Sequence, residues 1–273
     1  MSLHMREEDE RILLALATAG ESREELKPLV SFYEAVFRVQ FMAKADLAGD
    51  LRLPSPATCR ERLNSGLVLL TFDRLCLDTE CFTGLFQELI GVIVRSNPGW
   101  ELPRETLPPG ALVGIAHHWF ESGEHMVGNG PPGTLVALAV GFAVSTYLQE
   151  AAHRLLSQVD LGFWQRNTCP VCGGKPGFAL LSREDGSRRL FCPRCHAAWP
   201  YRRATCPFCE NEESTAYYPS NDEVHRLYVC HNCRRYLKAI DLRHTQREVI
   251  PAVERILTIA LDLAAQQEGF LYC

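Results

Sequence analysis

The sequence predicts an α+β protein: an N-terminal all-α helical domain, two tandem four-cysteine metal-ribbon units and a C-terminal helix. Three observations support this fold class. Apolar residues recur at helical spacing up to about residue 167, with no strand alternation of note. Eight of the 12 cysteines then form four C-x-x-C pairs, and helical spacing returns after Pro251. The expected segments are a tag remnant with an N-terminal helix (1–20), a helical domain (21–167), a metal-ribbon module (168–247) and a C-terminal helix packing on the rest (248–273).

Composition excludes several classes of protein. The chain has 273 residues, 47% of them hydrophobic and 22% charged, so it can bury a core and is not disordered. Its net charge of −5 argues against non-specific coating of nucleic acid. The acidic start, Glu7 to Glu10, differs from the basic start and apolar run of a secretory signal. We therefore expect a cytoplasmic protein, in which cysteine pairs bind metal or do redox work more often than they form disulfides.

The helical half is expected to be a bundle of about six helices. The expected helices with clear periodicity span residues 7–19, 28–41, 79–95, 111–120 and 134–156. A loop is expected at 52–58, where the sequence RLPSPAT holds two prolines. The apolar run 135–148 is too short to cross a bilayer and is interrupted by Ser145 and Thr146, so it predicts a buried core helix and no membrane span.

The ribbon region predicts short strands rather than helices. Aromatic and β-branched runs indicate strands near 178–181, 189–191 and 227–229, and Asp185-Gly186 is a turn signal between the first two. The aromatic residues of this region are expected to form a small core beneath the metal sites. The C-terminal helix has an apolar face and is expected to dock on the helical domain or on the ribbon module.

The four cysteine pairs have the spacing of two zinc ribbons in tandem. The pairs are Cys169-Pro-Val-Cys172, Cys192-Pro-Arg-Cys195, Cys206-Pro-Phe-Cys209 and Cys230-His-Asn-Cys233. Two long gaps flank a short one, which predicts two C-x-x-C…C-x-x-C units. The segment Leu190–Cys192 also resembles Tyr228–Cys230, as an internal repeat would.

A tetrahedral metal site needs four soft ligands, and two tight turns supply two thiolates each. Gly173 permits the positive φ that such a turn favours. Site one is expected to use Cys169, Cys172, Cys192 and Cys195, and site two Cys206, Cys209, Cys230 and Cys233. A cross-braced pairing fits the same spacings. Iron and zinc both suit such ligands, although only iron could carry an electron.

Other cysteine and histidine roles are weaker. A thioredoxin-type dithiol has one C-x-x-C opening a helix, which four pairs, three with proline after the first cysteine, do not match well. The remaining cysteines, Cys59, Cys76, Cys81 and Cys273, are expected to be small apolar residues in packing. His117 and His118 are expected to pack on a helix, and His196 and His231 are not needed for a four-sulfur site. No catalytic or cofactor-binding motif stands out, so we do not expect an enzyme.

The cysteine motifs and their surroundings resemble the formate dehydrogenase accessory protein FdhE family. The resemblance covers the last 105 residues or so, including Gly173-Gly174, Trp199, Arg202, Tyr236-Leu237-Lys238, Asp241 and the helix from Leu257. It implies a cytoplasmic assembly factor that binds the catalytic subunit of a respiratory formate dehydrogenase. It also implies two mononuclear rubredoxin-like iron sites on the eight cysteines, while the ligand set by itself suits iron or zinc. The oligomeric state is not decided by the sequence, and a homodimer is one alternative.

Nucleic-acid binding and electron transfer through iron ribbons are the alternatives. Residues 169–247 hold 13 Lys+Arg and 8 Asp+Glu, an excess of five positive charges. Four thiolates around a divalent ion carry a net charge of −2, so two such sites would reduce this excess from five positive charges to one. Arg194, Arg234 and Arg235 then fit local counter-charges better than a phosphate-binding face, and no nucleic-acid partner is expected.

Overall fold

The computed structural model describes residues 5–47, 51–97, 99–100, 107–122 and 131–272, and the predicted fold class is confirmed. The chain forms two compact units. The first, called the helical unit, comprises Met1–Leu53 and Leu70–His153, and the second, called the ribbon unit, comprises Pro54–Leu69 and Arg154–Cys273. The ribbon unit is thus larger than the expected range 168–247, since residues 54–69 and the C-terminal helices pack within it.

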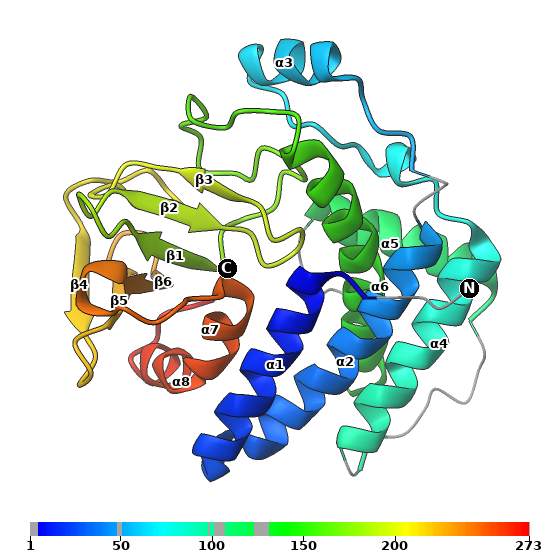
Figure 1. The fold of residues 1–273 in the computed structure, drawn as a ribbon, viewed down its shortest axis with the longest axis horizontal. Coiled ribbons are helices and arrows are strands. Elements are labelled where there is room, and N and C mark those ends of the chain that lie inside the picture. The colour runs from blue at the N-terminus through cyan, green and yellow to red at the C-terminus, as the bar shows by residue number, and fades with distance from the viewer. Residues whose placement is uncertain (1–4, 48–50, 98, 101–106, 123–130, 273) are drawn as a thin grey trace. The chain divides into compact units, whose positions relative to one another are not determined.

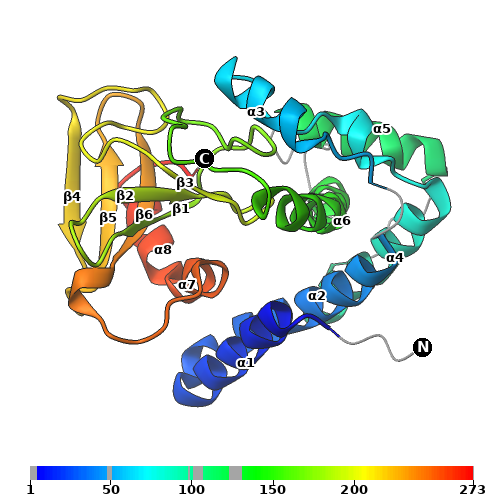
Figure 2. The same ribbon diagram turned by 45° about the horizontal axis from the view of Figure 1, so that its top comes forward.

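The helical unit is built from amphipathic helices around one buried helix. Its helices are α1 (Glu7–Ser22), α2 (Lys27–Asp46), α4 (Thr79–Ser96), α5 (Pro109–Ser122) and most of α6 (Pro131–Leu156), with single turns η1 (Glu24–Leu26) and η3 (Phe72–Leu75). Helices α1 and α2 run side by side (Figure 1, Figure 2). The expected helix boundaries are close to these, and Pro28 does lie in the first turn of α2.

Helix α6 is long and apolar enough to cross a membrane by length and composition alone. In the structure, however, 89% of its most apolar window is buried, with Leu135, Val140 and Leu148 fully enclosed. The predicted buried core helix is therefore confirmed. Two buried polar side chains of this interior are hydrogen-bonded, as most buried polar groups are: Lys44 Nζ donates to Asp9 at 2.8 Å and Gln40 Nε2 donates to the Phe142 carbonyl at 2.7 Å.

The expected loop at 52–58 is wrong in its second half. Helix α3 (Pro56–Asn64) begins inside it. The Ser55 hydroxyl accepts a hydrogen bond from the Thr58 amide at 3.2 Å, and Pro56 occupies the first helical position. Ser-Pro is a favourable helix start because the serine caps an orphan N–H and proline has none to satisfy. The two prolines therefore mark a helix N-terminus as well as a break.

The ribbon unit contains a six-stranded sheet in the order β3-β2-β1-β6-β5-β4. Its strands are β1 (Phe178–Leu181), β2 (Arg188–Phe191), β3 (Ala198–Pro200), β4 (Thr215–Pro219), β5 (His225–Cys230) and β6 (Arg235–Asp241). Each repeat is an antiparallel three-stranded meander. The two repeats join through a parallel pairing of β1 with β6, in which Ala179 faces Ala239. The repeats therefore follow each other head to tail in one continuous sheet.

The C-terminal region packs on the sheet of its own unit, as Figure 1 shows. Instead of one helix it forms α7 (Pro251–Leu257) and α8 (Ile259–Gln267), which are separated at Thr258. Lys238 Nζ, on β6, donates to the Arg255 carbonyl at 2.7 Å and pairs with Asp262 of α8. A buried lysine thus satisfies the carbonyl end of α7 and holds both helices to the sheet. Of the two expected docking partners, the ribbon module is the one that the structure supports.

Candidate metal centres

The four C-x-x-C pairs adopt one shared conformation, here called the knuckle. In each, the amide of the residue after the second cysteine donates to the carbonyl of the first cysteine, at 2.9–3.0 Å. That residue has a positive φ in every knuckle. The four residues are Gly173 (73°), His196 (63°), Glu210 (59°) and Arg234 (56°). The expected positive φ at Gly173 is confirmed, and three non-glycine residues adopt the same left-handed conformation at the equivalent positions.

The sheet brings the knuckles together in sequential pairs. Site one groups the sulfurs of Cys169, Cys172, Cys192 and Cys195, and site two those of Cys206, Cys209, Cys230 and Cys233. Within each site the ligand atoms all lie within 4.8 Å of one another. One knuckle of each site precedes the first strand of a meander, and the other lies between its second and third strands. The two meanders therefore build the two sites in the same way.

The sulfur geometry fits a tetrahedral ion. A Zn–S bond of about 2.3 Å in a tetrahedron separates the sulfurs by roughly 3.8 Å. The distances between knuckles are 3.4 Å for Cys169–Cys195 and 3.6 Å for Cys172–Cys192 in site one. In site two they are 3.7 Å for Cys206–Cys233 and 3.6 Å for Cys209–Cys230. These separations are far longer than a disulfide bond of about 2.05 Å. Each group could therefore hold one metal ion.

Burial gives the two sites different electrostatics. All four cysteines of site one are buried, and burial raises the pKa of the Cys169 and Cys195 thiols. Four thiolates there need a cation, because buried charge without a counter-charge is unfavourable. In site two, Cys209 and Cys233 are half-buried. Burial raises the pKa of the Cys209 thiol, but hydrogen bonds from Asn232, Asn211 and the neighbouring thiols together outweigh it and lower this pKa to about 6.

Site one is sealed by the segment that follows α3. The Leu69 amide donates to the Pro170 carbonyl at 2.9 Å, and Arg62 Nε donates to the Val68 carbonyl at 2.8 Å. The methyl groups of Val68 lie beside Gly173 of the first knuckle. This contact could not be found from the sequence, since about 100 residues separate the two segments and neither carries a motif for the other.

The aromatic residues of the ribbon unit divide into two groups. Phe178, Trp199 and Tyr236 are fully buried, as expected for a core beneath the sites, and Trp199 Nε1 donates to the Arg166 carbonyl at 2.9 Å. Tyr217 and Tyr218 on β4 are instead about half exposed, at 53% and 52%. The predicted aromatic core is thus confirmed for most of these residues but not for the β4 tyrosines.

The remaining candidate residues stay apart from both clusters. Cys59 is buried, Cys76 is half-buried and Cys81 is exposed, so the packing role expected for all of them fits Cys59 best. Cys273 lies outside the described residues. His117 is exposed and sits 3.9 Å from Glu121. Arg234 was expected to neutralise thiolate charge, and its guanidinium donates to the Glu268 carbonyl at 2.7 Å.

The fold and the two sites define a class of protein: an α-helical unit followed by a ribbon unit with two four-cysteine sites in tandem. Comparison with known proteins then narrows this class. The chain is 36% identical over 138 residues to the "Protein FdhE homolog" of Aquifex aeolicus, covering 48% of each chain. It is 30% identical over 116 residues to the homolog of Pseudomonas aeruginosa (39% of this chain, 37% of the other). The resemblance to the FdhE family is thereby confirmed, and no family model matches.

These alignments span about half the length, or less, of the curated relatives. The fold likeness extends further. The crystal structure of the FdhE protein from Pseudomonas aeruginosa superposes with a TM-score of 0.57 and 21% sequence identity, covering 97% of this chain and 92% of that one. The helical unit, which lies outside the last 105 residues that carry the sequence resemblance, therefore shares its fold with the solved protein as well.

Proposed function

We propose that this protein is a cytoplasmic accessory factor for the assembly of a respiratory formate dehydrogenase. It acts by binding the catalytic subunit of that enzyme and is not itself an enzyme. The observation that carries the proposal is the pair of four-cysteine sites in a chain similar to FdhE proteins. The described residues that form these sites bring together thiols only, with no general base or substrate-activating group among the ligands.

The eight cysteines are proposed to ligate two mononuclear metal ions, iron or zinc. When bound, either ion neutralises buried thiolates and ties two knuckles of one meander together. The chain's own groups prepare the sites: the knuckle turns fix the sulfurs, and the Phe208 amide donates to Cys206 Sγ at 3.4 Å. A closed shell of four cysteines without an open position is typical of structural sites.

Affinity purification of the tagged chain from a strain expressing formate dehydrogenase tests the proposed partner. The catalytic subunit is expected to co-purify, and a deletion strain is expected to lose most formate dehydrogenase activity. Complementation with a Cys206→Ser variant should restore less activity than complementation with Cys81→Ser, because Cys81 lies outside both sites. Full activity in the deletion strain would refute the proposal.

Electron transfer is a second candidate, favoured by the half-exposure of Cys209 and Cys233 at site two. An iron ion there would lie close enough to the surface to exchange an electron with a partner. Anaerobic purification with metal analysis and a visible spectrum decides this point. A colourless protein that contains only zinc excludes it.

A further inference from the structure

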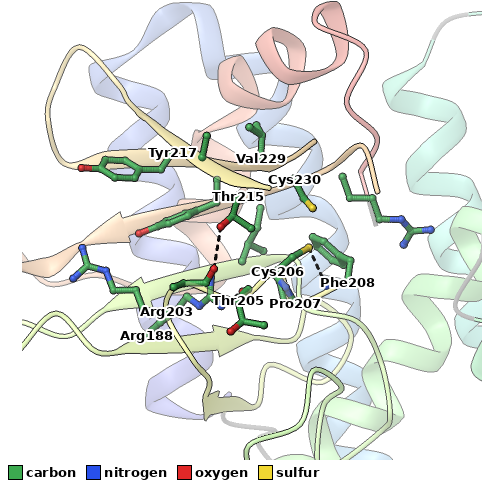
Figure 3. A pocket seen from close by; sticks show the side chains of 15 residues that line it. Arg188, Arg203, Thr205, Cys206, Pro207, Phe208, Thr215, Tyr217, Val229 and Cys230 are labelled. Carbon is green, nitrogen blue, oxygen red and sulfur yellow. Dashed lines mark hydrogen bonds between the residues drawn. The ribbon is translucent and has the colours of Figure 1, made fainter. Parts of the chain in front are cut away.

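A cavity of about 460 Å³ lies in the ribbon unit beside site two. Residues of β4, β5 and β6 form one part of its wall, and the segment leading into the knuckle at Cys206 forms another (Figure 3). Ala216, Val229 and Leu237 give the wall an apolar surface. A volume of this size is in the range of small-molecule sites, about 300–1,000 Å³.

Three arginines line this cavity, namely Arg188, Arg203 and Arg235, while none of the 15 lining residues is acidic. Within the described part of the chain, no carboxylate forms an ion pair with any of the three. Arg188 is only 3% exposed, and burial lowers the pKa of its guanidinium to about 10. A charge so enclosed is unfavourable unless a counter-charge lies near it.

The position of Arg188 is fixed by its surroundings. Its Nη2 donates to the Thr205 carbonyl at 2.5 Å and to the Arg202 carbonyl. The rings of Tyr201 and Tyr228 flank the guanidinium carbon at 5.3 Å and 5.8 Å. Arg188 Nε and the Tyr228 hydroxyl are buried and have no hydrogen-bond partner. The site thus holds a preorganised positive group with unused hydrogen-bonding capacity next to the cavity.

Site two supplies part of the missing negative charge, since Cys206 and Cys230 also line the cavity. Four thiolates around a divalent ion carry a net charge of −2. The three lining guanidiniums carry +3, so the groups that line the cavity keep an excess of one positive charge when site two holds its ion. A ligand with a single negative charge would neutralise this excess, and an apolar body on the same ligand would pack against the apolar part of the wall.

We propose that this cavity binds a carboxylate carried by an apolar or aromatic body. The carboxylate lies among the three arginines, and the body rests on Ala216, Val229 and the ring of Tyr217. Two sources offer this chemistry: a free aromatic acid, and the C-terminal carboxylate of a polypeptide that ends in an apolar residue. Both present one negative charge next to a flat or branched apolar group.

Calorimetric titration of the metal-loaded full chain tests the proposal with matched probes. The probes are phenylacetate, phenylacetamide, N-acetylphenylalanine, its amide and inorganic phosphate. At least one acid is expected to bind ten times more tightly than its own amide, and phosphate more weakly than that acid. The tighter of the two acids identifies the source. Equal affinity for acid and amide, or tighter binding of phosphate, overturns the proposal.

Two neighbouring arginines provide a matched pair of variants. Arg203→Gln removes a lining charge and is expected to weaken the acid at least fivefold, with metal content unchanged. Arg202→Gln is the control, because Arg202 pairs with Glu212 at 3.1 Å and does not line the cavity. Equal effects of the two variants would show that the cavity does not select the carboxylate.

Discussion

Single residues in the knuckles carry a conformational cost that differs from one knuckle to the next. Four equivalent positions have φ between 56° and 73°, but only one of them is glycine. The left-handed conformation costs a residue with a Cβ about 1 kcal/mol or more. His196, Glu210 and Arg234 therefore each lower the folding stability through their backbone conformation, but this conformation forms the turn that places the second cysteine of each knuckle.

Gly173→Ala and Glu210→Gly are expected to shift the free energy of unfolding in opposite directions. The alanine should destabilise by about 1 kcal/mol through its φ alone, because a Cβ there meets Val68 only at an ordinary 3.7 Å. The glycine should stabilise by a similar amount, and Glu210→Ala separates loss of the side chain from backbone relief. Urea unfolding at fixed zinc measures all three variants, and shifts of the same sign would contradict the strain argument.

His225 links stability to pH. Its Nδ1 lies 2.6 Å from Asp222 and its Nε2 lies 3.1 Å from Glu254. Burial lowers the pKa of this imidazole, but hydrogen bonds to the two carboxylates outweigh it and raise the pKa above 6.5. The folded protein thus favours the charged ring. This stabilisation is fully present below pH 6.5 and is lost as pH rises through the folded-state pKa.

The unfolding free energy of the native chain is therefore expected to approach that of His225→Gln as pH rises from below 6.5 through the folded-state pKa of the imidazole. Chemical unfolding at several pH values measures the difference. A gap that widens with pH would show that the neutral ring is the stabilising form.

Among the elements, β6 contacts both repeats of the sheet and both C-terminal helices. It pairs with β5 of its own repeat and with β1 of the other, and it also carries Lys238, which is 1% exposed. Burial lowers the pKa of the Lys238 ammonium to about 8, against the attraction of Asp262. Asp262 also accepts from the Tyr236 hydroxyl at 2.9 Å. One strand thus fixes the second repeat, the first repeat and both C-terminal helices.

Lys238→Met is expected to destabilise the ribbon unit by about 3 kcal/mol, because it leaves Asp262 buried without its counter-charge. The double variant Lys238→Met/Asp262→Asn should recover part of this loss, since the amide is neutral and can still accept from Tyr236. Thermal unfolding followed by near-ultraviolet circular dichroism measures both. A double variant less stable than the single one would contradict the charge argument.

The elements that the sequence predicts well are those defined by local patterns. Helical periodicity locates α1, α2, α4, α5 and α6, and cysteine spacing locates the knuckles. Strand β6 and its parallel pairing with the expected strand β1 were not predicted, because the burial of β6 depends on both repeats at once. The break at Thr258 depends on Lys238 from a distant strand, and Arg188 has no motif that marks it as part of a cavity. These features follow from tertiary packing rather than from local sequence.

At the scale of the whole molecule, the two metal sites differ in their access to solvent. Site one is enclosed by the segment after α3, whereas two ligands of site two are half exposed. A chelator can reach the metal of a sealed site only after local unfolding, whereas it can reach a partly exposed site with less structural opening. The helical unit has its own core and none of the clustered thiols. Metal removal should therefore act on one unit, and in two steps.

Chelator treatment of the zinc-loaded protein is expected to release one equivalent of metal quickly and a second slowly. Cys209→Ser should abolish the fast phase and leave the slow one, while Cys169→Ser should do the reverse. After both ions leave, the near-ultraviolet signal of Trp199 should collapse while most far-ultraviolet helix signal remains. Simultaneous release of both ions would contradict the difference in access.

The head-to-tail order of the two meanders gives the sheet a direction. Strand β1 is covered by β6, and β4 is the equivalent of β1 in the second repeat, so the outer edges at β3 and β4 are complementary rather than alike. A sheet with complementary ends could be extended indefinitely by further copies, unlike one closed by twofold symmetry. Pro200 and Pro219 end these two edge strands and each removes a backbone donor. Neither edge strand can therefore offer its full set of backbone hydrogen bonds to a further copy of the repeat.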